Sequence, residues 1–341
     1  MKRKIIVLFL AVFVLLTVGC AKIKPGNETE FADEMETIQA AYPLTLIDQT
    51  GREVIIEKEP ESIISGYYIS TSTLISLGQE NKLVGIENNA DKRPVYAYSS
   101  PEILELPSLG SVMEFDLEEC AMLNPDLVVI PTKLNGIIPT LEELGITVFV
   151  VNPESEELLE EMILLLGKAT GSEEKAKEIL LYKAEKLGEF QGNKNKPRIY
   201  FAGNSSLLTT AGPLMYQNSL IQNAGGKNVA AEVMDTYWAE VSYEQVLAWN
   251  PEYIILAADA AYTVEDVLAD TNLSECDAVK NKHEYKLPNT IECWDSPVPG
   301  SVLGVSWLAS ILHPQQYEIK QHEDTVIEFY ERFYGVTPIL E

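Results

Sequence analysis

The sequence is poor in histidine, in basic residues and in catalytic motifs. Its 341 residues include three histidines, all in the last fifth of the chain, which argues against a histidine-rich zinc or manganese site. Lysine and arginine total 25 against 52 acidic residues, so the net charge of −27 repels nucleic acid and anionic lipid. A Gly-x-Ser-x-Gly elbow, a phosphate-binding loop and a cysteine–histidine arrangement are all missing. We therefore expect no enzyme and no intrinsic cofactor.

Cysteine is also rare, with four residues in the whole chain. Cys120 falls on the apolar side of an amphipathic segment and is predicted to be a core thiol. Cys276 and Cys293 have the option of pairing in an oxidising compartment, and the sequence leaves this open. The fourth cysteine, Cys20, directly follows the N-terminal leader.

Long apolar runs are missing except at the N-terminus. Basic residues 2–4 precede an apolar stretch at 5–18, which is typical of a secretory signal and short for a membrane span. The sequence from Leu16 to Cys20 resembles a bacterial lipoprotein signal, although an ordinary signal peptide with an incidental cysteine remains the alternative. We expect residues 1–19 to be removed, which leaves a net charge of −30, and Cys20 to carry the lipid. Residues 20–41 are polar and are predicted to be a flexible tether that holds the protein outside the cytoplasm at the membrane.

Two segments 126 positions apart follow one pattern. Asp116 and Ser242 each precede a short amphipathic stretch, and each stretch ends at Asn-Pro before a buried apolar run. Glu119 and Gln245 stand three residues after these caps, so both starts are predicted to be capping boxes. Because a proline disfavours the helical region for the residue before it, both helices should end at the preceding asparagine.

Apolar strand-like runs alternate with helical segments on both sides of a long amphipathic stretch at 172–190. This order predicts an α/β fold with two Rossmann-like lobes, each with a parallel central sheet, joined by one long α-helix, and a ligand cleft between the lobes. The expected divisions are an N-terminal lobe at 42–170, a connecting helix at 171–192 and a C-terminal lobe at 193–341.

Several motifs in this order resemble the helix-linked (class III) substrate-binding proteins of ABC importers for iron–siderophore complexes, cobalamin and haem. They are Asp48-Gln49-Thr50-Gly51-Arg52, Leu106-Pro107-Ser108-Leu109-Gly110, Asn124-Pro125-Asp126, Ala224-Gly225-Gly226-Lys227-Asn228, Val241-Ser242-Tyr243-Glu244 and Leu303-Gly304-Val305-Ser306-Trp307. The resemblance covers almost everything after the tether. It implies a binding protein that delivers a metal chelate to an ABC permease dimer with its ATPase subunits, and it implies that Glu118 and Glu244 dock onto that permease.

Candidate cleft residues follow from the rule that ligands of open α/β sheets lie beyond the carboxyl ends of the strands. They are Tyr67, Tyr68, Arg93, Tyr96, Lys133, Asn204, Tyr216, Trp238, Tyr262, Trp294 and Asp295. Aromatic side chains offer broad contact, and the cations suit an anionic chelate. Trp294 is the preferred contact, because the two prolines that follow it indicate an irregular loop.

The sequence does not name the ligand. An iron–siderophore complex is the first expectation, a corrinoid such as cobalamin the second and haem the third, because few histidines are available to ligate haem iron. A structural or adhesive surface lipoprotein without a ligand is the alternative of another class.

Overall fold

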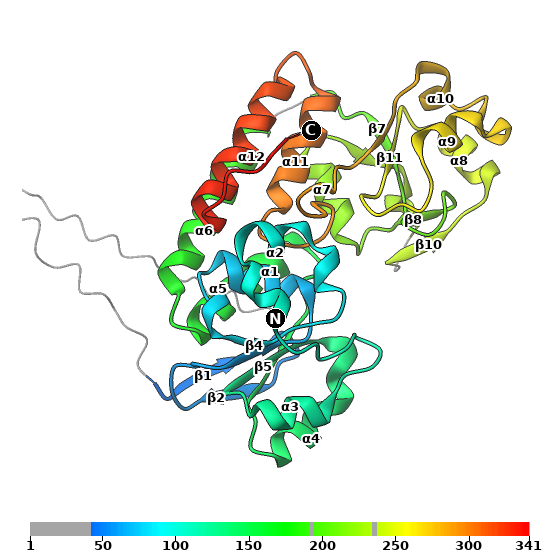
Figure 1. Ribbon diagram of the computed structural model, residues 1–341. Helices are drawn as coiled ribbons and strands as arrows, with labels where there is room; N and C mark the ends of the chain where they lie inside the picture. Colours follow the sequence, from blue (N-terminus) through cyan, green and yellow to red (C-terminus); the bar gives the residue numbers. More distant parts are fainter. Residues whose placement is uncertain (1–41, 191–193, 234–236, 341) are drawn as a thin grey trace, which may run out of the picture. The chain divides into compact units, whose positions relative to one another are not determined.

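The computed structural model describes residues 42–190, 194–233 and 237–340 (Figure 1). The predicted leader, Cys20 and the tether lie outside these residues. Within them, no helix is both long enough and apolar enough to cross a membrane. The strands form a two-stranded hairpin and a four-stranded sheet before residue 170, and a six-stranded sheet after residue 194.

The described residues begin with a hairpin, in which β1 (Leu44–Ile47) pairs antiparallel with β2 (Glu53–Ile56). The carboxylate of Asp48 organises the turn, since it accepts hydrogen bonds from the backbone N–H groups of Thr50 and Arg52 at 2.9 and 3.0 Å. Gly51 follows with φ at +83°, a value that suits glycine.

The first lobe contains a parallel sheet, as expected, and its strand order is β4-β3-β5-β6. Its strands are β3 (Ile63–Ser65), β4 (Leu83–Gly85), β5 (Leu127–Pro131) and β6 (Val148–Val151). The helices between and after them are α1 (Tyr68–Ser76), α2 (Pro94–Ser99), α3 (Leu117–Leu123), α4 (Ile138–Glu143) and α5 (Glu156–Ala169). Cys120 is fully buried in this lobe, which confirms the predicted core thiol.

The second lobe differs from the prediction because its sheet is mixed. The order is β10-β8-β7-β11-β12, with β9 beside β7. The strands are β7 (Arg198–Ala202), β8 (Thr209–Ala211), β9 (Lys227–Asn228), β10 (Trp238–Glu240), β11 (Tyr253–Leu256) and β12 (Glu284–Lys286). β8 and β10 run antiparallel to their neighbours. The connection from β7 to β8 is too short for the crossover that a parallel pair requires.

The second lobe's helices are α7 (Tyr216–Asn223), α8 (Tyr243–Trp249), α9 (Val264–Ala269), α10 (Asp277–Asn281), α11 (Ser301–Leu312) and α12 (Ile319–Tyr334). Cys276 and Cys293 are unpaired, so the disulfide that the sequence left open is not formed.

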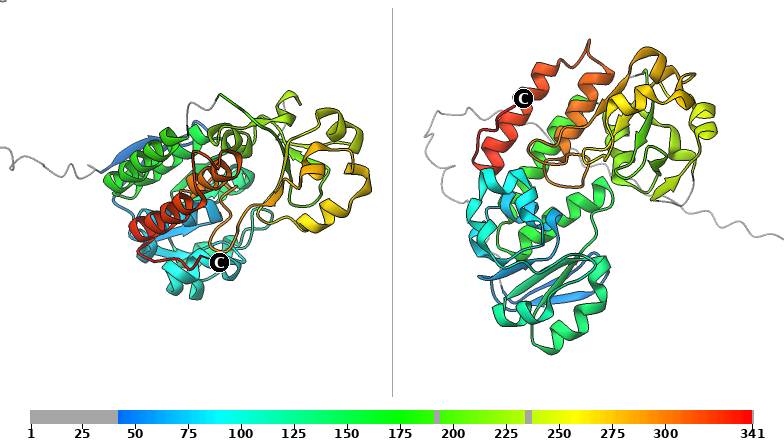
Figure 2. Two further views of the ribbon diagram at one scale, coloured as in Figure 1. Left: turned by 90° about the horizontal axis from the view of Figure 1, so that it is seen from above. Right: turned by 45° about the vertical axis from the view of Figure 1, so that its right-hand side comes forward.

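The long connecting helix is present as α6 (Glu173–Glu189). Ser172 occupies the N-cap position of α6, but its hydroxyl lies 2.9 Å from the Thr170 hydroxyl and does not bond the helix start. The sequence reading missed α5, which packs against α6, while α11 contacts both α6 and α12 (Figure 2). One continuous apolar core joins these helices to one face of each larger sheet, and each opposite face has its own smaller core.

The predicted repeat is present in both lobes. The Asp116 carboxylate accepts from the backbone of Glu119 at 2.9 Å, and the Ser242 hydroxyl accepts from the backbone of Gln245 at 3.3 Å. Neither α3 nor α8 shows the returning side-chain bond, so each has half of the predicted capping box. Both helices end at the expected asparagine.

The backbone conformation of these two asparagines was not predicted. Asn124 and Asn250 both have φ at +44°, in the left-handed region. Asparagine tolerates this region better than most residues, and the following proline permits it. The residue after each proline then accepts a hydrogen bond from the start of the neighbouring strand. Asp126 accepts from the backbone N–H of Ser62, and Glu252 accepts from the backbone N–H of Arg198. The two units thus share sequence pattern, backbone turn and strand connection.

Candidate ligand cleft

A cavity of about 690 Å³ lies between the carboxyl ends of strands from both lobes. The first lobe contributes side chains that follow β3, β5 and β6, and the second lobe contributes side chains that follow β7 and β11, the start of α7 and the loop before α11. Its lining includes Tyr67, Tyr68, Arg93, Lys133, Asn152, Glu154, Asn204, Met215, Tyr216, Gln217, Tyr237, Trp238, Asp259, Asp295 and Ser296. A second cavity of about 390 Å³ adjoins it on the first lobe and shares Tyr67, Tyr68, Arg93, Lys133 and Glu154 with it. We call these two cavities together the cleft.

An aromatic and cationic wall separates the cleft from a smaller side cavity of about 190 Å³. The Arg93 guanidinium lies over the ring of Tyr68, 4.1 Å from its centroid, and Tyr67 meets Tyr68 edge to face at 5.2 Å. The Tyr68 hydroxyl donates a hydrogen bond to the Ser296 hydroxyl of the second lobe at 2.9 Å. Arg93 is half-buried and forms no ion pair with any residue that the structure describes.

Carboxyl groups also reach the cleft, and burial weakens their acidity. Asp295 is 5% exposed and accepts a hydrogen bond from the backbone of Ala258 at 3.0 Å. Burial raises its pKa to about 6. Burial likewise raises the pKa of Glu154, and the nearby Lys133 partly opposes this rise. The cleft therefore contains both acidic and basic side chains, and Arg93 is its half-buried basic residue.

The structure brings most of the predicted residues to this cleft. They are Tyr67, Tyr68, Arg93, Lys133, Asn204, Tyr216, Trp238 and Asp295. Tyr96 lines the side cavity instead, and its buried hydroxyl donates to the Glu87 carboxylate at 2.8 Å. Tyr262 is absent from the lining because it packs on the outer core of the second lobe and donates to the backbone carbonyl of Gly203 at 2.7 Å.

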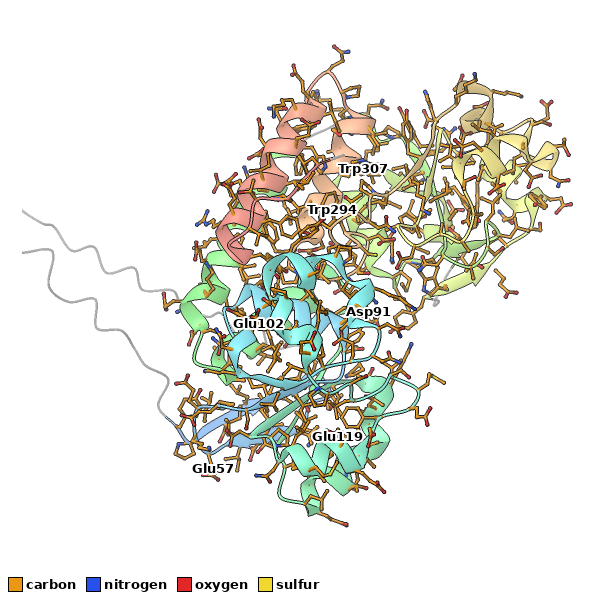
Figure 3. All side chains as sticks on the ribbon, in the orientation of Figure 1. Glu57, Asp91, Glu102, Glu119, Trp294 and Trp307 are labelled. Carbon is orange, nitrogen blue, oxygen red and sulfur yellow. The ribbon has the colours of Figure 1, made fainter. Side chains whose placement is uncertain are left out.

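The expectation that Trp294 lines the cleft is wrong. Trp294 is 3% exposed and lies among packed side chains near the start of α11 (Figure 3). Its indole N–H donates to the hydroxyl of Tyr330 in α12 at 3.0 Å. The proline-rich loop does reach the cleft, through Asp295, Ser296 and Pro297. The prediction was therefore right for the loop and for Asp295, wrong for Trp294, and did not include Ser296 and Pro297.

Sequence reasoning missed several lining residues, among them Asn152, Glu154, Gln217 and Asp259. Asn152 and Glu154 come directly after β6, so the strand-end rule already contained the signal for them. Gln217 and Asp259 had no comparable signal, because single polar residues near a helix start or in a loop are common.

Glu118 and Glu244 lie on the surface, each as the second residue of its helix in the repeat. The Ser242 hydroxyl, followed by the helix-start backbone, lowers the pKa of Glu244 and favours its charged form. Neither side chain takes part in the cleft. Their role in docking stays a prediction.

Comparisons with known proteins agree with this architecture. The periplasmic binding protein family matches residues 63–290. The molybdate-binding protein MolA of Haemophilus influenzae is 24% identical over 89% of this chain and 91% of its own. The structure of molybdate-bound MolA superposes with a TM-score of 0.75 and covers 87% of this chain and 100% of its own.

Two further relatives extend the comparison. A cobalamin-binding protein of Halobacterium salinarum is 22% identical over 89% of this chain and 82% of its own. A periplasmic solute binding protein of Veillonella parvula has a TM-score of 0.76 at 26% identity, and the match covers 87% of this chain and 94% of that one. With a two-lobed α/β fold, a connecting helix and a cleft between strand ends, the chain belongs to the periplasmic binding protein family.

Proposed function

We propose that this protein is the extracytoplasmic substrate-binding component of an ABC importer and that its cleft captures a metal chelate, in the first place an iron–siderophore complex. The observation that carries the proposal is Arg93. A half-buried guanidinium that stacks on Tyr68, lines the cleft and forms no ion pair with a carboxylate among the described residues is suited to an anionic group of a ligand.

The size and chemistry of the cleft support a bulky ligand. Its main cavity of about 690 Å³ falls within the range of roughly 300–1,000 Å³ that is usual for drug-sized ligands. The aromatic side chains of Tyr67, Tyr237 and Trp238 provide broad contact surfaces, and the latter two are exposed at the second lobe. A corrinoid is the second candidate, because a relative is named for cobalamin and this exposed aromatic pair suits a large macrocycle. Haem is the third candidate.

The ligand is identified by titrating the mature protein with ferric siderophores of the hydroxamate, catecholate and carboxylate classes, cyanocobalamin, haemin and molybdate. Calorimetry and native mass spectrometry report binding. We expect a ferric siderophore to bind most tightly. Binding of a corrinoid or haemin in its place would reassign the chelate. If none of these ligands binds, the proposal fails in favour of a structural surface lipoprotein.

The Arg93→Gln variant should weaken binding of the preferred anionic chelate by about 10- to 150-fold, because a hydrogen bond to a charged group contributes roughly 1.5–3 kcal/mol. The matched control is Lys58→Gln, which removes one positive charge from the same lobe at an exposed pair with Asp126, outside the cleft lining. Equal affinities of the two variants would show that Arg93 does not contact the ligand.

We further propose that the mature protein is held at the membrane by lipid on Cys20. The reasons are the lipoprotein-like sequence from Leu16 to Cys20 and the polar stretch that follows. In cells fed radiolabelled palmitate, Cys20→Ala should abolish the label, and Cys293→Ala should retain it. Label that persists on the Cys20 variant would refute the anchor.

A further inference from the structure

A lysine in the middle of the connecting helix is completely buried. The side chain of Lys183 in α6 has no exposed surface. Its ammonium nitrogen lies 3.0 Å from a carboxylate oxygen of Glu156 and donates a hydrogen bond to the Ser301 hydroxyl at 3.0 Å. Glu156 and Ser301 are buried as well. A buried charge is costly unless it is paired, so this position depends strictly on its partners.

The three partners come from three different parts of the chain. Glu156 begins α5 of the first lobe, two residues after Glu154 of the cleft wall. Ser301 begins α11 of the second lobe, and Lys183 belongs to the helix between the lobes. Together, the ion pair with Glu156 and the hydrogen bond to Ser301 tie both lobes to the connecting helix, and we call these three residues the joint.

The joint also reaches the floor of the cleft through Tyr216, the first residue of α7. Burial, and after it the Glu156 carboxylate, raises the pKa of Tyr216. The Tyr216 hydroxyl has no well-aligned hydrogen bond here, although it is buried. Glu156 and Ser301, two members of the joint, both influence this hydroxyl, which connects Tyr216 of the cleft to the joint.

We propose that Lys183 is a positioning residue for ligand binding. Through Glu156 it holds the Asn152–Glu154 wall, and through Ser301 it holds the second-lobe floor at Tyr216, so that the pair fixes the lobe separation at which ligand is bound. The inference rests on the proposed function in so far as the cleft binds a ligand. A buried ion pair often stabilises a fold no better than apolar residues of similar volume, and in some proteins it restricts the geometry of the elements it joins, which is the role we assign to it here.

The first test measures lobe separation without ligand. Nitroxide labels on Glu118→Cys and Glu244→Cys, one exposed site per lobe, report the distance distribution by pulsed electron resonance in a Cys293→Ser background. The double variant Lys183→Met/Glu156→Leu removes both charges, so it avoids an unpaired buried carboxylate and should melt at a temperature no lower than the parent. We expect its distance distribution to broaden or shift. An unchanged distribution overturns the inference.

The matched control is Lys177→Met on the same helix, where Lys177 pairs at the surface with Glu173 and Glu174. This control should leave the distribution unchanged. If it broadens the distribution as much as the double variant does, the effect belongs to the helix in general and the inference fails.

The second test measures affinity for the ferric complex of a trihydroxamate siderophore. If the binding-competent arrangement falls to about a tenth of the population, apparent affinity falls about tenfold in the double variant, with the melting temperature preserved. Equal affinity of parent and double variant would overturn the inference. If the parent itself binds no chelate, the proposed function fails, and the distance measurement still decides whether Lys183 fixes the lobes.

Discussion

Reversal of both Glu118 and Glu244 to lysine should abolish ligand uptake by cells while ligand affinity remains that of the parent. The two carboxylates are exposed at equivalent positions of the repeat, one in each lobe, and lie outside the cleft lining. The resemblance to the helix-linked binding proteins implies that these positions meet arginines of the permease, and lysines there would place like charges against each other. Uptake in cells and calorimetry on the purified protein measure the two properties.

A matched double reversal separates docking from general charge effects. Glu157 and Glu265 are also exposed, lie one in each lobe and are likewise the second residues of helices, α5 and α9. Their reversal changes the net charge and the helix starts equally and should leave uptake intact. If the control pair abolishes uptake as well, or if the Glu118 and Glu244 reversal also abolishes ligand binding, the docking assignment is wrong.

Glu292→Gln should stabilise the folded protein by about 3 kcal/mol at pH 8 and have little effect at pH 4. Glu292 is buried between the lobes, where its carboxylate accepts from the Ser72 hydroxyl at 2.5 Å. Burial raises its pKa from 4.5 to about 7, and Ser72, Arg93 and Tyr330 only partly oppose this rise. Because one pKa unit corresponds to about 1.4 kcal/mol, the rise is worth about 3 kcal/mol.

The direction of this pH dependence follows because Glu292 binds its proton more tightly in the folded protein than in the unfolded chain. Below about pH 4.5 both folded and unfolded Glu292 are protonated, and its contribution to stability is complete. Between there and about pH 7 the unfolded chain loses the proton first, so stability falls as pH rises. Urea unfolding at several pH values measures this, with exposed Glu102→Gln as control (Figure 3). A Glu292→Gln variant whose stability tracks the parent at every pH would refute the assignment.

The fold could be predicted from the sequence wherever several local signals indicated the same element. The two Asn-Pro units carried a cap, an amphipathic helix, a breaker and a buried apolar run, and every one of these is in the structure. The helix α5 was missed although Ser155 does cap it, since its hydroxyl accepts from the backbone of Leu158. The strands β8 and β10 are short and lack an apolar run, so only pairing with distant residues defines them.

For the cleft, the strand-end rule located the residues that the backbone itself delivers, such as Tyr67 and Lys133. The rule failed for Trp294, because that side chain is buried and bonds to Tyr330, which lies 36 positions later in the chain. A local sequence pattern predicts where a loop lies. It does not predict which side chain of that loop will be covered by a helix from a distant part of the sequence.

The contacts of helix α12 determine when the core between the lobes can be completed during folding. α12 ends 7 residues before the last residue of the chain, yet its Tyr330 covers Trp294, and its Tyr334 hydroxyl lies 2.9 Å from the Ser72 hydroxyl in α1, 262 positions earlier. Contacts over such separations form late, since the intervening chain must first be closed into a loop. The core between the lobes is therefore completed only once α12 is available to pack. A product truncated before α12 would leave apolar surface uncovered and would be an early substrate for proteases.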